Sequence, residues 1–282
     1  MDIYLDTKDI INIMERSSPC TPTELDHQLR QGNHNLVISC ANILELSAPL
    51  LEKKSKTDVM SLLNHVERLP VKFVADFMLY EMELREAVTA FMQHREYRQV
   101  NPFTDRFDKA FMGDASPTKL YLRLSLAEAV FELWMVNPDV FNIHKKQTRA
   151  AQEVFRADRN LSKWPNLQKH FETVINRDLE VAKISFAPAA MRKFSRWIYE
   201  DADRCPAIRL QYEVHHRILK NLADIPKSGD MFDFSHVRCI PYVKLLTLDK
   251  RIYSYVSQVL KDLSLGSRSW IFSDARDLLK KI

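Results

Sequence analysis

LVISCANILEL, at residues 36–46, decides the fold class together with IYLDTKDII at residues 3–11 and VKLLTLDKRI at residues 243–252. Each stretch begins with a short apolar run that favours a β-strand, and apolar residues at helical spacing follow it. Strands that alternate with helices at this spacing form a parallel sheet with right-handed crossovers. We therefore expect an α/β protein, with a three-layer α/β/α arrangement and a mostly parallel central sheet.

Composition indicates a helix-rich globular chain. Of the 282 residues, 46% are hydrophobic and 28% are charged, and only four are glycine. Glycine destabilises helix interiors, so its scarcity favours helices. The four glycines are far apart and form no Gly-rich phosphate loop, which excludes the Rossmann and P-loop nucleotide-binding classes at the motif level. Four cysteines without C-x-x-C spacing indicate structural thiols in a reducing compartment rather than a disulfide framework or a zinc site.

No segment of the sequence has the pattern of a membrane or export signal. The opening MDIYLDTKDI carries three aspartates and no long apolar run, unlike a signal peptide. An uninterrupted apolar stretch of about 18 residues, as a membrane span requires, does not occur. We therefore expect a cytoplasmic protein that does not bind membranes. The net charge of +4 is too small to identify a nucleic-acid partner by itself.

Acidic residues gather at the predicted carboxyl ends of the strands. Asp6 and Asp249 each end a strand, and Glu45 lies in the first turns of the helix that follows residues 36–39. Asp230 and Asp233 lie three positions apart on the helix before the strand that ends at Asp249. Ligands of open parallel sheets bind outside the carboxyl ends of the strands. These residues therefore predict an acidic functional site at that edge.

Clustered carboxylates repel one another unless a cation offsets their charge. Hard oxygen ligands without clustered Cys or His select Mg²⁺ or Mn²⁺, and such ions can activate water for attack on a phosphodiester. A purely local interpretation is also open. Asp6 alone could be a helix N-cap, and Asp249 could be a strand-end cap before Lys250.

The same stretches, with DMFDFSHVRCIPYVKLLTLDKRI at residues 230–252, resemble the motifs of PIN (PilT N-terminus) domain nucleases, in particular a bacterial PIN-like subgroup. The resemblance covers residues 1–92 and 227–282. It implies a metal-dependent nuclease, acting on RNA more than on DNA, that hydrolyses phosphodiester bonds and leaves a 5′-phosphate. The implied catalytic and metal-binding acids are Asp6, Glu45, Asp233 and Asp249, with Asp230 competing for the third position. The hydroxyls of Thr7 and Thr247 would support these ligands.

His236 falls one turn after Asp233 and has two interpretations. It could be a partner of a carboxylate or of the substrate phosphate. It could equally be a hydrogen-bonded histidine on a helix face. The sequence leaves both open.

The chain departs from the PIN pattern in its middle. We expect a PIN-like core at 1–92 and 227–282, interrupted by an all-helical insertion at 93–226 that holds 22 Lys and Arg against 17 Asp and Glu. A basic appendage on an acidic core suits nucleic acid held by its backbone, although basic residues on helices are also commonly just solvated. The candidate contacts are Lys145, Lys146, Arg149, Arg192, Lys193 and Arg196.

A second class of function is compatible with the same sequence. The chain could be a non-catalytic PIN-like scaffold whose insertion binds a protein or nucleic-acid partner. Within the nuclease interpretation, an antitoxin-like protein partner and a homodimer are both compatible with the sequence. The sequence does not distinguish an endonuclease from an exonuclease.

Overall fold

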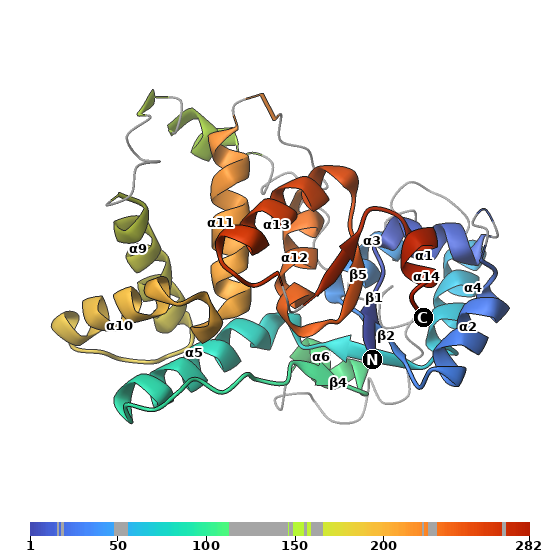
Figure 1. Ribbon diagram of the computed structural model, residues 1–282, viewed down its shortest axis with the longest axis horizontal. Coiled ribbons are helices and arrows are strands. Elements are labelled where there is room, and N and C mark those ends of the chain that lie inside the picture. Colours follow the sequence, from blue (N-terminus) through green and yellow to red (C-terminus); the bar gives the residue numbers. More distant parts are fainter. Residues whose placement is uncertain are drawn as a thin grey trace.

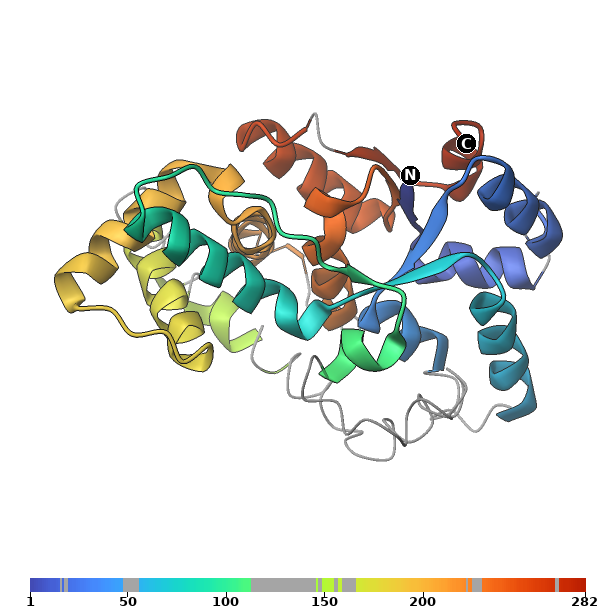
Figure 2. The same cartoon turned by 90° about the horizontal axis from the view of Figure 1, so that it is seen from below.

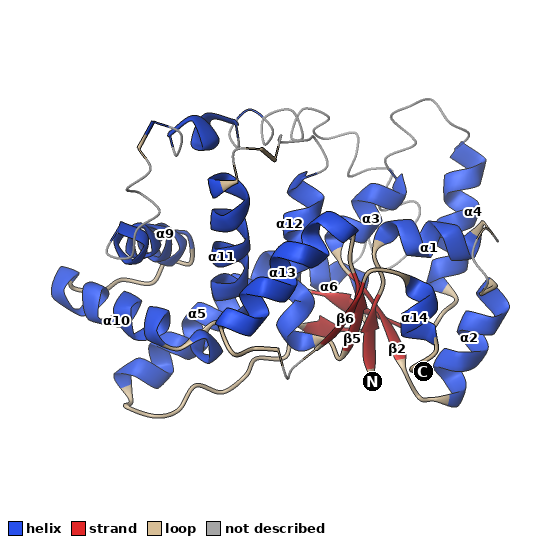
Figure 3. Ribbon diagram, turned by 45° about the horizontal axis from the view of Figure 1, so that its top comes forward, coloured by secondary structure: helices blue, strands red, loops and turns tan. Residues whose placement is uncertain are grey.

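A six-stranded sheet forms the centre of the computed structural model (Figures 1 and 3). The strand order is β4-β3-β2-β1-β5-β6, and every pair is parallel except β3–β4. The strands are β1 (Asp2–Tyr4), β2 (Asn35–Ile38), β3 (Val71–Val74), β4 (Phe103–Thr104), β5 (Leu245–Thr247) and β6 (Trp270–Phe272). The predicted α/β class with a mostly parallel sheet is therefore confirmed.

Helices connect the strands and account for most of the chain. The structure describes residues 1–15, 17, 20–47, 56–112, 146, 149–154, 157–158, 166–221, 223–224, 230–266 and 269–282. Before the third strand the helices are α1 (Thr7–Met14), α2 (Pro22–Gln31), α3 (Cys40–Ser47) and α4 (Lys56–Glu67). The middle of the chain contains α5 (Asp76–Met92), α6 (Phe107–Met112), α9 (Asn166–Val181), α10 (Pro188–Glu200), the 3-10 turn η4 (Ala202–Arg204) and α11 (Pro206–Lys220). The last part contains α12 (Asp230–Cys239), the 3-10 turn η5 (Ile240–Tyr242), α13 (Lys250–Asp262) and α14 (Ala275–Leu279).

Alternate residues of each strand bury opposite faces of the sheet, as the two-residue strand period requires. Ile3 and Leu36 belong to a core with α1, α2, α3 and α4, whereas Tyr4 and Val37 belong to a core with α11, α12 and α13. Both faces of the sheet are thus covered by helices. This arrangement confirms the predicted three layers, which are visible in Figure 2.

A capping box opens the second helix of the chain. Thr21 accepts a hydrogen bond from the backbone N–H of Glu24 at 3.2 Å, and a Glu24 oxygen accepts one from the backbone N–H of Thr21 at 2.7 Å. This reciprocal capping box opens α2 with Pro22 at its first position.

Residues 93–226 do not form a purely helical appendage, contrary to the sequence-based expectation. β4 lies in this region and pairs antiparallel with β3 at the edge of the sheet. α11 contributes Leu210, Val214 and Ile218 to the core that also contains α12 and α13. A strand of two residues is too short to leave a periodic signal, and its pairing with β3 is a tertiary contact.

The remaining helices form a helical lobe, which we define as α9 and α10 with the faces of α5 and α11 that pack on them. Its core contains Phe171, Ile175, Phe194, Ile198 and Ile208. α5 and α11 are shared between this lobe and the rest of the protein, so the lobe lies directly beside the sheet layers (Figure 1).

All four cysteines lie in the described part of the chain. Cys20, Cys40, Cys205 and Cys239 are all buried free thiols. In the part of the chain that the structure describes, no helix is both long enough and apolar enough to cross a bilayer.

A buried carboxylate on α5 holds the first turn of α11. Glu83 is fully buried and accepts hydrogen bonds from the backbone N–H groups of Ala207 at 2.8 Å and Ile208 at 3.0 Å. The hydroxyl of Tyr242 in η5 donates to the same carboxylate. The first N–H groups of a helix have no partner within the helix, and a negative charge there is favourable. Glu83 therefore connects α5, α11 and η5.

We expect Glu83→Ala to lower the free energy of unfolding by about 3 kcal/mol, because it leaves two buried N–H groups and the Tyr242 hydroxyl without their acceptor. Chemical denaturation monitored by circular dichroism measures this change. Glu96→Ala, at an exposed glutamate just beyond α5, is the control and is expected to change stability by less than about 0.5 kcal/mol. Equal stability of the Glu83 and Glu96 variants would contradict this role of Glu83.

Candidate functional site

Two of the predicted acids cap helices at the same edge of the sheet. Asp6 follows β1 and accepts a hydrogen bond from the backbone N–H of Lys8 at 3.0 Å, which makes it the N-cap of α1. Asp249 stands in the same relation to β5 and α13 and accepts from the backbone N–H of Arg251 at 2.9 Å. Because β1 and β5 are adjacent parallel strands, both caps lie at their common carboxyl edge. Each aspartate therefore caps a helix, as the local interpretation predicts, and both aspartates also lie at the same edge of the sheet.

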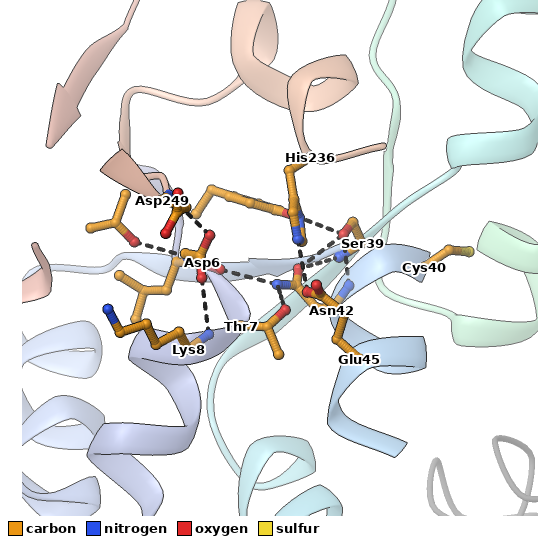
Figure 4. Close-up of polar contacts among 12 residues, drawn as sticks. Asp6, Thr7, Lys8, Ser39, Cys40, Asn42, Glu45, His236 and Asp249 are labelled. Atoms are coloured by element: carbon orange, nitrogen blue, oxygen red, sulfur yellow. Dashed lines mark hydrogen bonds and ion pairs between the residues drawn. The ribbon is translucent and has the colours of Figure 1, made fainter. Parts of the chain in front are cut away.

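Direct hydrogen bonds join these two strand ends (Figure 4). The Asp6 carboxylate accepts from the backbone N–H of Asp249 at 3.2 Å. The buried Thr247 hydroxyl accepts from the backbone N–H of Asp6 at 2.8 Å. Thr247 thus holds the backbone that carries the first acid.

A buried amide attaches α3 to the end of β1. Asn42 is fully buried and its side-chain N–H₂ donates to the Leu5 carbonyl and to the Thr7 hydroxyl, each at 3.1 Å. Its side-chain oxygen accepts from the backbone N–H of Ser39 at 3.0 Å. The Thr7 hydroxyl is therefore a partner of this amide, and Asn42 fixes the helix that carries Glu45.

His236 lies between the acids as a buried partner of Glu45. Its Nε2 is 2.9 Å from Glu45 Oε2, and its Nδ1 is hydrogen-bonded to the buried Tyr4 hydroxyl. Burial opposes a charge on the ring, but the charge and hydrogen bond of Glu45, with the charges of Asp6 and Asp233, raise the pKa of His236 to about 9. The ring is therefore an imidazolium at neutral pH, and of the two sequence interpretations the structure shows the carboxylate partner.

The third acid faces two cations. Asp233 acts electrostatically on His236, and its Oδ2 lies 3.7 Å from Nη1 of Arg251. Arg251 in turn makes a 2.9 Å ion pair with Asp224. The backbone of Asp230 begins α12, but its side chain lies outside the described ones, so the structure leaves the choice between Asp230 and Asp233 open.

Burial and the neighbouring charges both shift the pKa of Asp6. Burial raises the pKa of Asp6, and the negative charge of Glu45 adds to the rise. The charge of His236 and the N–H groups of Lys8 and Asp249 act in the opposite direction. The rise outweighs these contributions, so a further cation near Asp6 would be favourable.

Sequence reasoning missed two polar residues at this edge. One is Asn42, which stands out only as an amide in a mostly apolar helix. The other is Asp9 on α1, whose pKa is raised by burial and by the charges of Asp6 and Asp274. A single helical turn separates Asp9 from Asp6, so i, i+3 spacing could have identified it.

The donor chemistry of the cluster fits Mg²⁺ or Mn²⁺, but the described side chains are not assembled as ligands. Asp6, Glu45 and Asp233 all act on His236, and all offer carboxylate oxygens of the kind that hard cations prefer. Among the residues that the structure describes, however, no three His, Cys, Asp or Glu side chains form a group that could hold a metal ion as they stand. Binding would therefore require these side chains to move toward a common point.

Three of the basic residues predicted to contact nucleic acid lie on α10, in the helical lobe. Arg192, Lys193 and Arg196 are exposed on α10, at the far end of the helical lobe (Figure 1). Arg196 makes an ion pair with Glu200 at 2.7 Å. Lys146 and Arg149 are also exposed, and Lys145 lies outside the described residues.

Comparison with known proteins adds no family assignment. No protein-family model, no curated protein and no solved structure matches this chain.

We expect the imidazolium of His236 to make stability depend on pH. Because its folded pKa of about 9 lies above the unfolded value of 6.5, its contribution is complete below pH 6.5 and is lost as the pH rises through 9. The loss is at most about 3 kcal/mol. Urea unfolding at pH 6, 7.5 and 9.5 measures it.

The matched variant for this measurement is His236→Gln, which keeps a polar side chain but cannot carry the charge. The difference in unfolding free energy between wild type and variant should shrink between pH 6.5 and 9.5. A difference that stays constant over this range would show that no charge on His236 stabilises the fold.

Proposed function

We propose that the protein is a divalent-metal-dependent nuclease that hydrolyses phosphodiester bonds, in RNA more readily than in DNA. The observation that carries the proposal is the hydrogen bond from the Asp249 backbone to the Asp6 carboxylate, across 243 positions of sequence. It supports a common site for acids from both ends of the chain. The PIN-like order of the motifs around them is the second support.

The residues that would hold Mg²⁺ or Mn²⁺ are Asp6, Glu45, Asp233 and Asp249. When bound, such an ion activates water and stabilises the leaving oxygen of a phosphodiester. Water then serves as the nucleophile, so no side chain of the protein needs to form a covalent bond with the substrate.

The surrounding residues would keep the acids in place during the reaction. Thr247 holds the backbone of Asp6, and Asn42 holds α3, which carries Glu45. His236 contacts Glu45 through Nε2 and so limits the rotation of that carboxylate. Its positive charge also lowers the repulsion among the acids before a cation binds.

We expect Asp6→Asn and Asp249→Asn each to lower the Mn²⁺-dependent cleavage rate of labelled single-stranded RNA at least about 100-fold, because each removes a charged metal ligand. Asn caps a helix about as well as Asp. At position 6 it can accept only one of the two backbone hydrogen bonds that the carboxylate accepts, so circular dichroism first confirms that each variant is folded. Labelled single-stranded DNA is cleaved in parallel, and EDTA should abolish both reactions.

The matched control for this experiment is Asp58→Asn, at an exposed aspartate on α4, which should keep the wild-type rate. A fully active Asp6→Asn variant would refute the assignment of the site. Wild-type protein that cleaves neither RNA nor DNA would favour the non-catalytic scaffold.

We also expect Mn²⁺ to raise the melting temperature of the wild type. At 100 times its dissociation constant, a ligand adds about 2.7 kcal/mol, which corresponds to roughly 5 °C for a chain of this size. The Asp6→Asn/Asp249→Asn double variant should not show the increase. An equal increase in both proteins would place the metal elsewhere, and no increase in the wild type would contradict binding at this cluster.

A further inference from the structure

A cavity of about 580 Å³ lies in the helical lobe. Its walls come from α5, α9, α11, the end of α12 and the helical residues 151–154, with Tyr80, Tyr212 and Arg238 among the lining residues. Cavities of about 300–1,000 Å³ are typical of small-molecule sites. α12 packs on both α11 and α3. Its residue Arg238 lines the cavity, its residue His236 contacts Glu45, and no candidate metal ligand is among the lining residues.

The charge of this cavity favours an anion. The described lining contains two guanidinium groups, Arg177 and Arg238, against one carboxylate, Asp178. The Arg177 side chain is 69% exposed and makes a 2.9 Å ion pair with Asp178. Arg238 donates to Gln211 at 3.1 Å, and its guanidinium lies 4.9 Å from the centroid of the Tyr80 ring. Arginine is well suited to phosphate because its planar N–H groups can bind two oxygens.

Flat, uncharged rings form another part of the wall. Tyr212 and His216 stack with their centroids 6.5 Å apart and an interplanar angle of 14°. His170 lies against Tyr212, with Nδ1 3.1 Å from the tyrosine oxygen. Burial lowers the pKa of both His170 and His216, so these rings are neutral at pH 7. Such surfaces suit a planar aromatic group better than an aliphatic chain.

Amide side chains complete the lining. Asn166 and Gln211 both contribute to the cavity. Asn and Gln side chains offer a donor and an acceptor side by side, which is the pattern that the edge of a nucleobase complements.

We propose that this cavity binds a nucleoside monophosphate, with the phosphate on Arg177 and Arg238 and the base among the rings of Tyr212, His170 and His216. This site is separate from the acidic edge. The proposal therefore does not depend on the proposed nuclease activity.

Isothermal titration of the full chain with AMP, GMP, CMP and UMP tests the proposal. We expect one mole of at least one nucleotide to bind per mole of protein with a micromolar dissociation constant. The corresponding nucleoside and inorganic phosphate should each bind at least tenfold more weakly, because each lacks half of the recognised chemistry. Failure of all four nucleotides to bind, or equal binding of the nucleoside, would overturn the proposal.

Variants locate the binding site. Arg238→Gln and Arg177→Gln should each weaken nucleotide binding at least tenfold, and Arg276→Gln, at an exposed arginine on α14, should not change it. Arg177 is exposed, so its variant decides the question if Arg238→Gln fails to fold. Wild-type affinity of the Arg177 variant would overturn the proposal.

The Asp6→Asn/Asp249→Asn double variant separates this proposal from the nuclease proposal. Nucleotide binding should be unchanged in this variant, whether or not it cleaves RNA. Loss of nucleotide binding in it would place the nucleotide at the acidic edge and overturn the cavity assignment.

Discussion

The parallel pairing of β1 with β5 is the constraint on which the rest of the structure depends. It joins the two ends of the chain in one sheet, with Tyr4 opposite Leu246. This pairing places every acid of the candidate site except Glu45. Asp6 and Asp249 follow these two strands, and the helix that carries Asp233 leads into β5. Hydrogen bonds of Asp6 with Thr247 and Asp249 also connect the carboxyl ends of these two strands.

The acidic edge balances repulsion against several sources of positive charge. Helix N-termini face Asp6 and Asp249, the buried His236 lies beside Glu45, and the partly buried Arg251 lies beside Asp233. Helix dipoles and buried cations both favour ionised carboxylates. Burial nevertheless raises the pKa of Asp6, and the charge of Glu45 adds to this rise. A cluster in that state gains free energy from a further cation, which is the physical basis of the proposed metal dependence.

The helical lobe is joined to the sheet layers through α5 and α11. The Glu83 carboxylate on α5 holds the first turn of α11, and α11 then buries one face against α12. α12 itself carries Asp233 and His236 toward the acids, and Arg238 toward the cavity of the lobe. A single helix therefore contributes to both the proposed metal site and the proposed nucleotide site.

The sequence by itself determined the α/β class, the positions of β1, β2 and β5, and the placement of Asp6 and Asp249. Apolar periodicity and N-cap preference, on which these predictions depend, are local properties. Only the tertiary structure decided the role of His236, whose contact with Glu45 spans 191 positions. It also decided the pairing of β4 and the partners of Asn42. The cavity of the helical lobe also depends on the tertiary structure, because helices distant in sequence form its walls. Contacts of this range depend on how the layers pack, which no local pattern of residues encodes.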